Sequence, residues 1–172
     1  MRALCLKKPL AGIRPSLVYS PPRMRRTIFQ ARFAVRRSRP GLGQGLFATA
    51  DIRHGDFILE YTGRRIQTSV ADTLKTRYLF EVDGTWTIDG SSRSNTARYI
   101  NHSCVPNCEG EIRDGAILIY ASRDIKRGEE LTLDYGQEYF DEFIKPVGCK
   151  CDHCTRSRFS PQAIFAKLRL AA

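Results

Sequence analysis

The hydrophobic residues of this chain fall in short runs and do not follow the spacing of long amphipathic helices. The runs are mostly apolar and three to five residues long, and they occupy residues 33–35, 46–48, 57–59, 78–82, 86–88 and 116–120. Gly, Pro, Asp and Asn lie between them, which is typical of strands joined by turns. We therefore predict a mainly β domain of many short strands.

Helices are expected to be few and short. Residues 69–77 and 94–100 could each form one or two turns, and residues 161–170 carry apolar positions with helical spacing. We interpret residues 161–172 as a short C-terminal helix or tail.

The first 32 residues differ from the rest in composition. They are rich in Pro and Arg and show no sustained apolar period, so residues 1–32 are interpreted as a basic, mostly disordered leader. The lack of acids is also typical of an organellar transit peptide, and Met24 could be the start in place of Met1.

No run approaches the ~18 apolar residues that a membrane span needs. This predicts a soluble, intracellular protein without membrane association.

Charge is unevenly distributed along the chain. The formal net charge is +10; residues 1–50 hold 11 Lys or Arg and no acid, whereas residues 51–172 hold 17 bases and 18 acids. A basic arm of this kind can bind the phosphates of a nucleic acid, or an acidic protein surface, by attraction that weakens as salt rises. The alternative is a solvated leader without a partner.

Two ten-residue segments are similar to each other. Residues 47–56 read FATADIRHGD, and residues 120–129, 73 positions later, read YASRDIKRGE. Each segment predicts a strand followed by a charged turn in which Gly can adopt positive φ. We expect the two units to pack against each other.

Two further strings carry the most specific information. Residues 98–108 read RYINHSCVPNC, and residues 128–136 read GEELTLDYG. They resemble the RFxNHSCxPN and GEELTxDY signatures of SET-domain protein-lysine methyltransferases. GLGQGLFA at 41–48 and EYTG at 60–63 resemble the first two motifs of that family, in the same order along the chain.

The resemblance implies a SET fold of several small curled sheets, with a C-terminal pseudoknot that brings the NHSC stretch beside the DY stretch. It divides the chain into a SET domain at 33–144 and a post-SET zinc-binding tail at 145–160, with no pre-SET cysteine cluster. The implied activity is transfer of a methyl group from S-adenosylmethionine to a lysine of a protein, such as a histone or another nucleic-acid-associated protein. Such an enzyme would be cytoplasmic in a bacterium and nuclear or chromosomal in a eukaryote.

The same resemblance implies a cofactor site. The backbone of the glycine-rich turn would approach the methionine part of S-adenosylmethionine, the Asn-His pair would hold its adenine and amino-acid parts, and the preceding Arg would support that loop. The predicted cofactor-binding residues are Gly43, Gln44, Gly45, Arg98, Asn101 and His102. The alternative is that both stretches are turns that satisfy only their own backbone.

Methyl transfer needs little acid or base from the enzyme, because a sulfonium is already a good leaving group. It needs a neutral amine that approaches the methyl group in line with the sulfur. A free lysine has a pKa of about 10.4, so an apolar channel beside a cation is needed to favour its neutral form. By resemblance to the family, Tyr135 would orient the amine, Tyr78 would line the lysine channel, and Tyr61 would support the floor of the site. The alternative for each tyrosine is ordinary core packing.

Five of the six cysteines lie after residue 103, and three lie within residues 149–154, a spacing that favours metal binding over disulfides. The post-SET resemblance implies one structural Zn2+ with four thiolate ligands. The predicted ligands are Cys104, Cys149, Cys151 and Cys154. The last spacing is shorter than is common in the family, so His153 or Cys108 could replace one ligand, and reduced thiols without metal are the remaining alternative.

Two other classes of protein fit part of these observations. A SET-like adaptor without turnover could bind nucleic acid or chromatin through its arm, but the retained Asn101, His102 and Tyr135 argue against it. A small zinc-stabilised nucleic-acid binder would carry C-x2-C pairs on one element, whereas the fourth cysteine here lies 45 residues upstream. For a basic substrate tail, attraction would have to come from the acidic groups within 109–114 or 138–142.

Overall fold

The structure is a computed structural model that describes residues 32–158. Within this part of the chain, no helix is long and apolar enough to cross a bilayer. The expectations of a disordered leader and of a helix at 161–170 concern residues outside the described part, apart from residue 32 itself.

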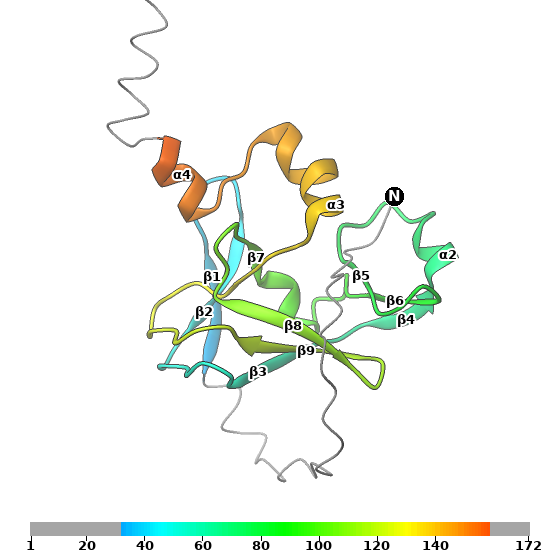
Figure 1. The fold of residues 1–172 in the computed structure, drawn as a ribbon, viewed down its shortest axis with the longest axis horizontal. Coiled ribbons are helices and arrows are strands. Elements are labelled where there is room, and N and C mark those ends of the chain that lie inside the picture. The colour runs from blue at the N-terminus through cyan, green and yellow to red at the C-terminus, as the bar shows by residue number, and fades with distance from the viewer. Residues whose placement is uncertain (1–31, 159–172) are drawn as a thin grey trace, which may run out of the picture.

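Four small sheets make up most of the fold (Figure 1). Two sheets have two strands: β1 (Phe33–Arg37) pairs antiparallel with β2 (Gln44–Ala48), and β7 (Asn101–His102) pairs parallel with β10 (Thr132–Leu133). The others have three strands, in the orders β3 (Phe57–Tyr61), β9 (Ala116–Ala121), β8 (Cys108–Arg113) and β4 (Arg64–Gln67), β6 (Trp86–Asp89), β5 (Leu79–Glu81). The prediction of a mainly β domain is confirmed.

Short helices connect and cap these sheets. They are α2 (Thr68–Ala71), the 3-10 turn η1 (Thr96–Tyr99), α3 (Gln137–Tyr139), the π-helical turn η2 (Phe140–Ile144), the 3-10 turn η3 (Lys145–Val147) and α4 (Asp152–Arg158). The first two overlap the predicted helical segments. Figure 1 shows α3 and α4 at the same end of the molecule, close to β1 and β7.

The apolar runs do not predict strands β4 and β8. Both are outer strands of their sheets: β4 reads RRIQ and is mostly exposed, and β8 reads CEGEIR. An outer strand can carry charges on exposed positions; β4 and β8 do so and leave no apolar run, whereas the outer strands β3 and β5 bury their side chains and were predicted. Their strand character comes from pairing with β6 and β9.

The two similar ten-residue segments pack against each other, as expected. Ile52 and Ile125 exchange two backbone hydrogen bonds, of 2.9 and 2.8 Å. The Asp51 carboxylate accepts from the backbone N–H of Arg127 at 2.9 Å, and the Asp124 carboxylate accepts from that of His54 at 2.8 Å. Equivalent residues of the two copies therefore make equivalent contacts, which is an approximate twofold symmetry. The pairing aligns β2 with the segment that leads into β10.

Strands β7 and β10 bring the NHSC stretch beside the DY stretch. Their parallel pairing is continued by a 2.8 Å hydrogen bond from the Ser103 N–H to the Leu133 carbonyl. The buried Asn107 side chain supports the pair: its Nδ2 donates to the Glu130 carbonyl at 2.9 Å, and its Oδ1 accepts from the Thr132 N–H at 2.8 Å. The arrangement implied by the family resemblance is therefore present.

Candidate active site

A cavity of about 840 Å3 lies between the β1–β2 turn, the segments around β7, and the helical segment that follows β10. Its walls include seven of the eight residues predicted to bind cofactor or to catalyse: Gly43, Gln44, Tyr78, Arg98, Asn101, His102 and Tyr135. Tertiary structure thus gathers residues from positions 43 to 135 around one space. The cavity size is within the range of small-molecule sites in proteins.

Gly45 is the predicted cofactor residue that does not line this cavity. It is buried, and a Cβ atom at this position would collide with the Glu130 carboxylate. The lack of a side chain at residue 45 is therefore required for the approach of Glu130 to β2, which is a packing role.

Glu130 is a residue of the site that the predictions missed. Its carboxylate accepts hydrogen bonds from Ser38 Oγ at 2.7 Å and from Asn101 Nδ2 at 2.7 Å. The same Asn101 nitrogen donates to the Gln44 carbonyl at 3.0 Å. These contacts join the glycine-rich turn to β7. Glu130 lies in the GEELTLDY string that resembles a family signature, but its contacts are with residues far away in the sequence.

His102 links the cofactor cavity to the cysteines. Its Nδ1 accepts the Tyr135 backbone N–H at 3.3 Å, which assigns the ring proton to Nε2. That nitrogen lies 3.5 Å from Cys104 Sγ and can donate to the sulfur. Burial lowers the pKa of His102, so the imidazole is neutral at pH 7.

A second, narrower cavity of about 50 Å3 adjoins the first and is lined by aromatic rings. Tyr61, Tyr78, Tyr135 and Tyr139 form its walls, together with Leu133. Tyr135 donates its hydroxyl proton to the Ile100 carbonyl at 2.5 Å. Burial raises the pKa of Tyr135 far above its ordinary value, so the phenol keeps its proton at physiological pH.

Tyr61 contributes to this narrow cavity from β3. Its hydroxyl donates to the Tyr78 carbonyl at 2.9 Å, and its side chain is buried in the core. Burial raises the pKa of Tyr61 well above its usual range, so it also stays a neutral phenol. Its position agrees with the predicted supporting role.

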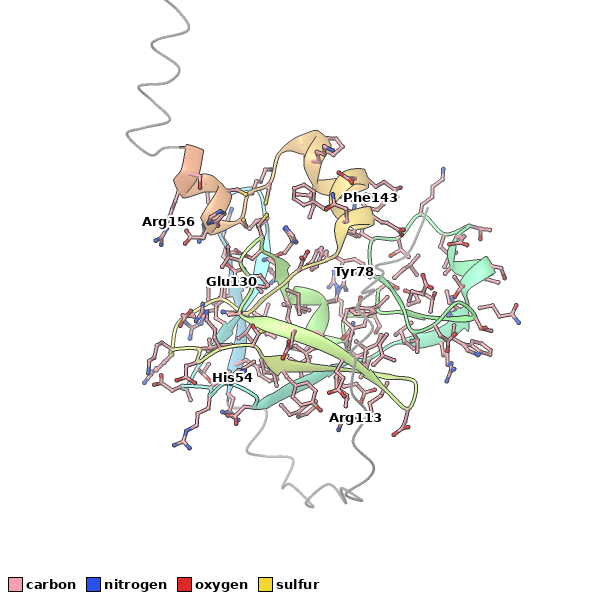
Figure 2. The ribbon with its side chains drawn as sticks, viewed as in Figure 1. His54, Tyr78, Arg113, Glu130, Phe143 and Arg156 are labelled. Atoms are coloured by element: carbon pink, nitrogen blue, oxygen red, sulfur yellow. The ribbon has the colours of Figure 1, made fainter. Side chains whose placement is uncertain are left out.

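The helical segment after β10 supplies aromatic side chains that sequence analysis did not assign to the site. The Tyr139 ring centroid lies 5.0 Å from that of Tyr135, and Phe143 lies 4.7 Å from Tyr139. Phe143 and Ile144 line the large cavity. Figure 2 shows Phe143 on this segment, above Tyr78. The positions 139, 140, 143 and 144 have helical spacing, so the sequence indicates an apolar helical face but not the cavity that it covers.

The four predicted zinc ligands lie together. Their sulfur atoms are all within 4.8 Å of one another, with Cys104 Sγ 3.8 Å from Cys149 Sγ and 3.6 Å from Cys154 Sγ. A tetrahedral zinc with Zn–S bonds of about 2.3 Å requires sulfur separations of about 3.8 Å. These cysteines can therefore hold one zinc ion. The alternatives His153 and Cys108 are not in the cluster.

The electrostatics of the cluster also fit a metal ion. Burial raises the pKa of Cys149 to about 11 and raises that of Cys104 further. Burial acts in the same direction on Cys151, but the backbone N–H groups of Cys104 and Cys154 and the neighbouring thiols outweigh it and lower its pKa to about 6. Several adjacent thiolates repel one another, and a divalent cation compensates that charge.

The family model of the SET domain matches residues 43–136, which is more than half of the chain. The chain belongs to the SET-domain family. The matched residues contain both cavity-forming stretches, the glycine-rich turn and the β7–β10 pair, and end just after Tyr135. The cysteines at 149–154 follow the matched residues after the helical segment formed by α3, η2 and η3.

Curated relatives of this SET domain are much longer proteins. The histone-lysine N-methyltransferase trithorax of Drosophila virilis is 37% identical over 126 residues, a match that covers 66% of this chain and 3% of that protein. An H3 lysine-4-specific histone-lysine N-methyltransferase of Emericella nidulans is 41% identical over 120 residues, covering 62% of this chain and 10% of that protein. The chain therefore spans a small fraction of these relatives.

A solved structure supports the fold. The structure described as ctPRC2 in an autoinhibited conformation bound to S-adenosylmethionine contains a chain that is 32% identical, with a TM-score of 0.57. The match covers 62% of this chain and 15% of that one. The SET fold predicted from the motifs is confirmed.

The zinc cluster gives a first prediction. The purified protein is expected to contain about one zinc per chain, because four thiolate ligands form a closed structural site. Cys154→Ser should lower the zinc content and the melting temperature, both measurable by elemental analysis and calorimetry. Cys108→Ala, outside the cluster, should keep the metal. Full zinc content in Cys154→Ser would contradict this ligand set.

Glu130 gives a second prediction. Glu130→Ala removes the acceptor that holds Asn101 and Ser38, and hydrogen bonds to a charged group are worth about 1.5–3 kcal/mol. We expect the affinity for S-adenosylmethionine, measured by titration calorimetry, to fall roughly 10-fold. Glu109→Ala, exposed on β8, should bind normally. If folded Glu130→Ala binds the cofactor with wild-type affinity, the proposed link between the two loops is wrong.

Proposed function

We propose that this protein transfers a methyl group from S-adenosylmethionine to a lysine side chain of a protein substrate. The observation that carries the proposal is that most of the predicted cofactor residues and Tyr135 line one cavity. The second, narrower cavity with its aromatic walls, here called the channel, adjoins it. The names of the curated relatives support lysine methylation, and the S-adenosylmethionine bound to the similar solved structure supports the methyl donor. Histones, which the relatives' names mention, are therefore included among the substrates to test.

Residues of this chain can hold the cofactor and position the amine. When bound, S-adenosylmethionine supplies an activated methyl group on a positively charged sulfur. The turn at Gly43 and Gln44, together with Asn101 and His102, would hold it in the large cavity. Tyr135 donates its proton to the Ile100 carbonyl, so its oxygen lone pairs are free to accept a hydrogen bond from the substrate amine.

The channel also favours the neutral amine that the reaction needs. Its walls are mostly phenol and alkyl groups, which solvate an ammonium ion poorly. Arg77 and Arg98 line it as well, and nearby positive charge disfavours a protonated lysine. Asp134 opposes this effect from an exposed position. The proton would therefore leave the lysine before transfer and enter solvent.

The proposal extends to the basic residues that precede the described part. We assign residues 1–31 a contact with nucleic acid near the substrate, and, for a eukaryotic source, we assign the protein to the nucleus. The support is the concentration of Lys and Arg without acids in this segment.

The activity is tested with isotopically labelled S-adenosylmethionine and a mixture of histones, other basic proteins and cell lysate. We expect label on lysine, and we expect Tyr135→Phe to lower the rate on the order of 100-fold, since misplacing the reacting groups carries a penalty of that size. Cofactor binding by both proteins, measured by calorimetry, is the control. Cofactor binding without transfer to any protein would favour the adaptor function instead.

The arm is tested by deleting residues 1–31, which retains the 2.7 Å ion pair between Arg32 and Asp56. DNA binding in a gel-shift assay should weaken at least ~10-fold, because the phosphate-neutralising charges are lost. Methylation of a short peptide should keep its rate. Equal loss of both properties would show that the arm supports the catalytic domain itself.

A further inference from the structure

Basic side chains line the large cavity, and no acidic side chain of the described residues lines it to balance their charge. The four basic residues are Arg77, Arg93, Arg98 and Lys150. None of the four forms an ion pair with another described residue, whereas Arg39, Arg123 and Arg156 nearby are all paired with carboxylates. The acidic groups within 109–114 and 138–142, proposed from the sequence to attract a basic substrate, do not line the cavity.

Arg98 lines both cavities, and its side chain is only partly satisfied. Its guanidinium stacks over the Tyr78 ring, 4.1 Å from the centroid. Its Nε is buried and, among the described residues, is the one buried side-chain nitrogen or oxygen without a hydrogen-bond partner. A buried donor of this kind is costly unless a ligand supplies an acceptor.

Arg77 lines the narrow channel with a side chain that is exposed to solvent. It also lines the large cavity, and its guanidinium lies 5.5 Å from the centroid of Phe143. An exposed cation that lines the channel can reach the residues next to a lysine inserted there. Arg93 is also exposed, but it lines only the large cavity and not the narrow channel.

The cofactor does not neutralise this site. S-adenosylmethionine carries a carboxylate, an ammonium group and a sulfonium, so its net charge is positive. Its carboxylate can pair with one cation, and its sulfur adds another positive charge next to the channel. A substrate with basic residues around the target lysine would add further repulsion, and in a partly enclosed site that repulsion is weakly screened.

We propose that the substrate presents its lysine in an acidic sequence, with Asp or Glu beside the lysine pairing with Arg77, which lines both the cofactor cavity and the channel. The inference rests on the proposed methyltransferase function and narrows its substrate class. Peptides with an acidic context are favoured over basic tails such as those of histones. Arg77 is then a specificity-determining residue, whereas Arg93 lines only the cofactor cavity and Lys150 lies beside Gly41 of the glycine-rich turn.

The test compares fluorescent peptides that have one central lysine and are flanked by Glu, Ala or Arg. Binding to the full chain is measured by anisotropy in the presence of S-adenosylhomocysteine, and methylation is measured in parallel. The Glu-flanked peptide should bind roughly 5-fold tighter than the Ala-flanked one, and the Arg-flanked one roughly 5-fold weaker, as expected for partly exposed ion pairs. The differences should shrink as salt rises.

A matched pair of variants separates the site from general attraction to the basic arm. Arg77→Glu should abolish the preference for the Glu-flanked peptide. Lys75→Glu changes the net charge equally, but Lys75 lines neither cavity. The preference of this variant for the Glu-flanked peptide should therefore stay within roughly 2-fold of the wild-type value.

Each outcome bears on one of the two proposals. Equal binding of the three peptides, tighter binding of the Arg-flanked one, no binding, or equal effects of the two variants would overturn the acidic-substrate inference. If the Ala- and Glu-flanked peptides are methylated equally well, the transferase function stands and the charge preference falls. If the Glu-flanked peptide is bound selectively but is never methylated, the charge preference stands and the transferase function falls.

Discussion

The pairing of β7 with β10 is the constraint on which the site depends. Each strand is two residues long, too short to hold a sheet by its own backbone bonds. The buried Asn107 amide supplies two further hydrogen bonds to the segment at 130–132, and Glu130 then reaches Asn101 and Ser38. Through this network, the glycine-rich turn, the NHSC stretch and Tyr135 have defined positions relative to one another. A buried polar network of this kind specifies one arrangement because partial pairing is costly.

Charges of opposite sign are separated across the site. On one side, four sulfur ligands gather negative charge that a zinc ion would compensate, and His102 connects Cys104 to the Tyr135 backbone. On the other side, Arg77 and Arg98 line the aromatic channel without carboxylate partners among the described residues. The metal cluster would thus stabilise the wall of the cofactor cavity, while the arginines act on whatever approaches the channel. This division follows from where the tertiary structure places each group.

Much of the fold and of the candidate site could be predicted from the sequence, and the features that were missed have physical explanations. Short apolar runs with turn residues between them revealed the strands that bury side chains, including the outer strands β3 and β5. The same criterion does not detect β4 or β8, whose residues are mostly charged or exposed. Tyr139 and Phe143 have the spacing of a helical face, but nothing local to them says that this face would cover a cavity. Gly45 has a recognisable motif position, yet its neighbour in space is Glu130, 85 positions later.

The family, the mainly β fold class, the set of four cysteines and seven of the residues that line the large cavity could all be predicted from the sequence alone. Short motifs and the local spacing of apolar residues indicate these properties, and each such pattern spans only a few residues. Tertiary structure alone decided that Glu130 clamps Asn101, that helical aromatics extend the channel, and that the cavity carries arginines without acids among the described residues. The reason is that these features depend on distances between residues far apart in the chain, and those distances exist only once the small sheets have closed around one another.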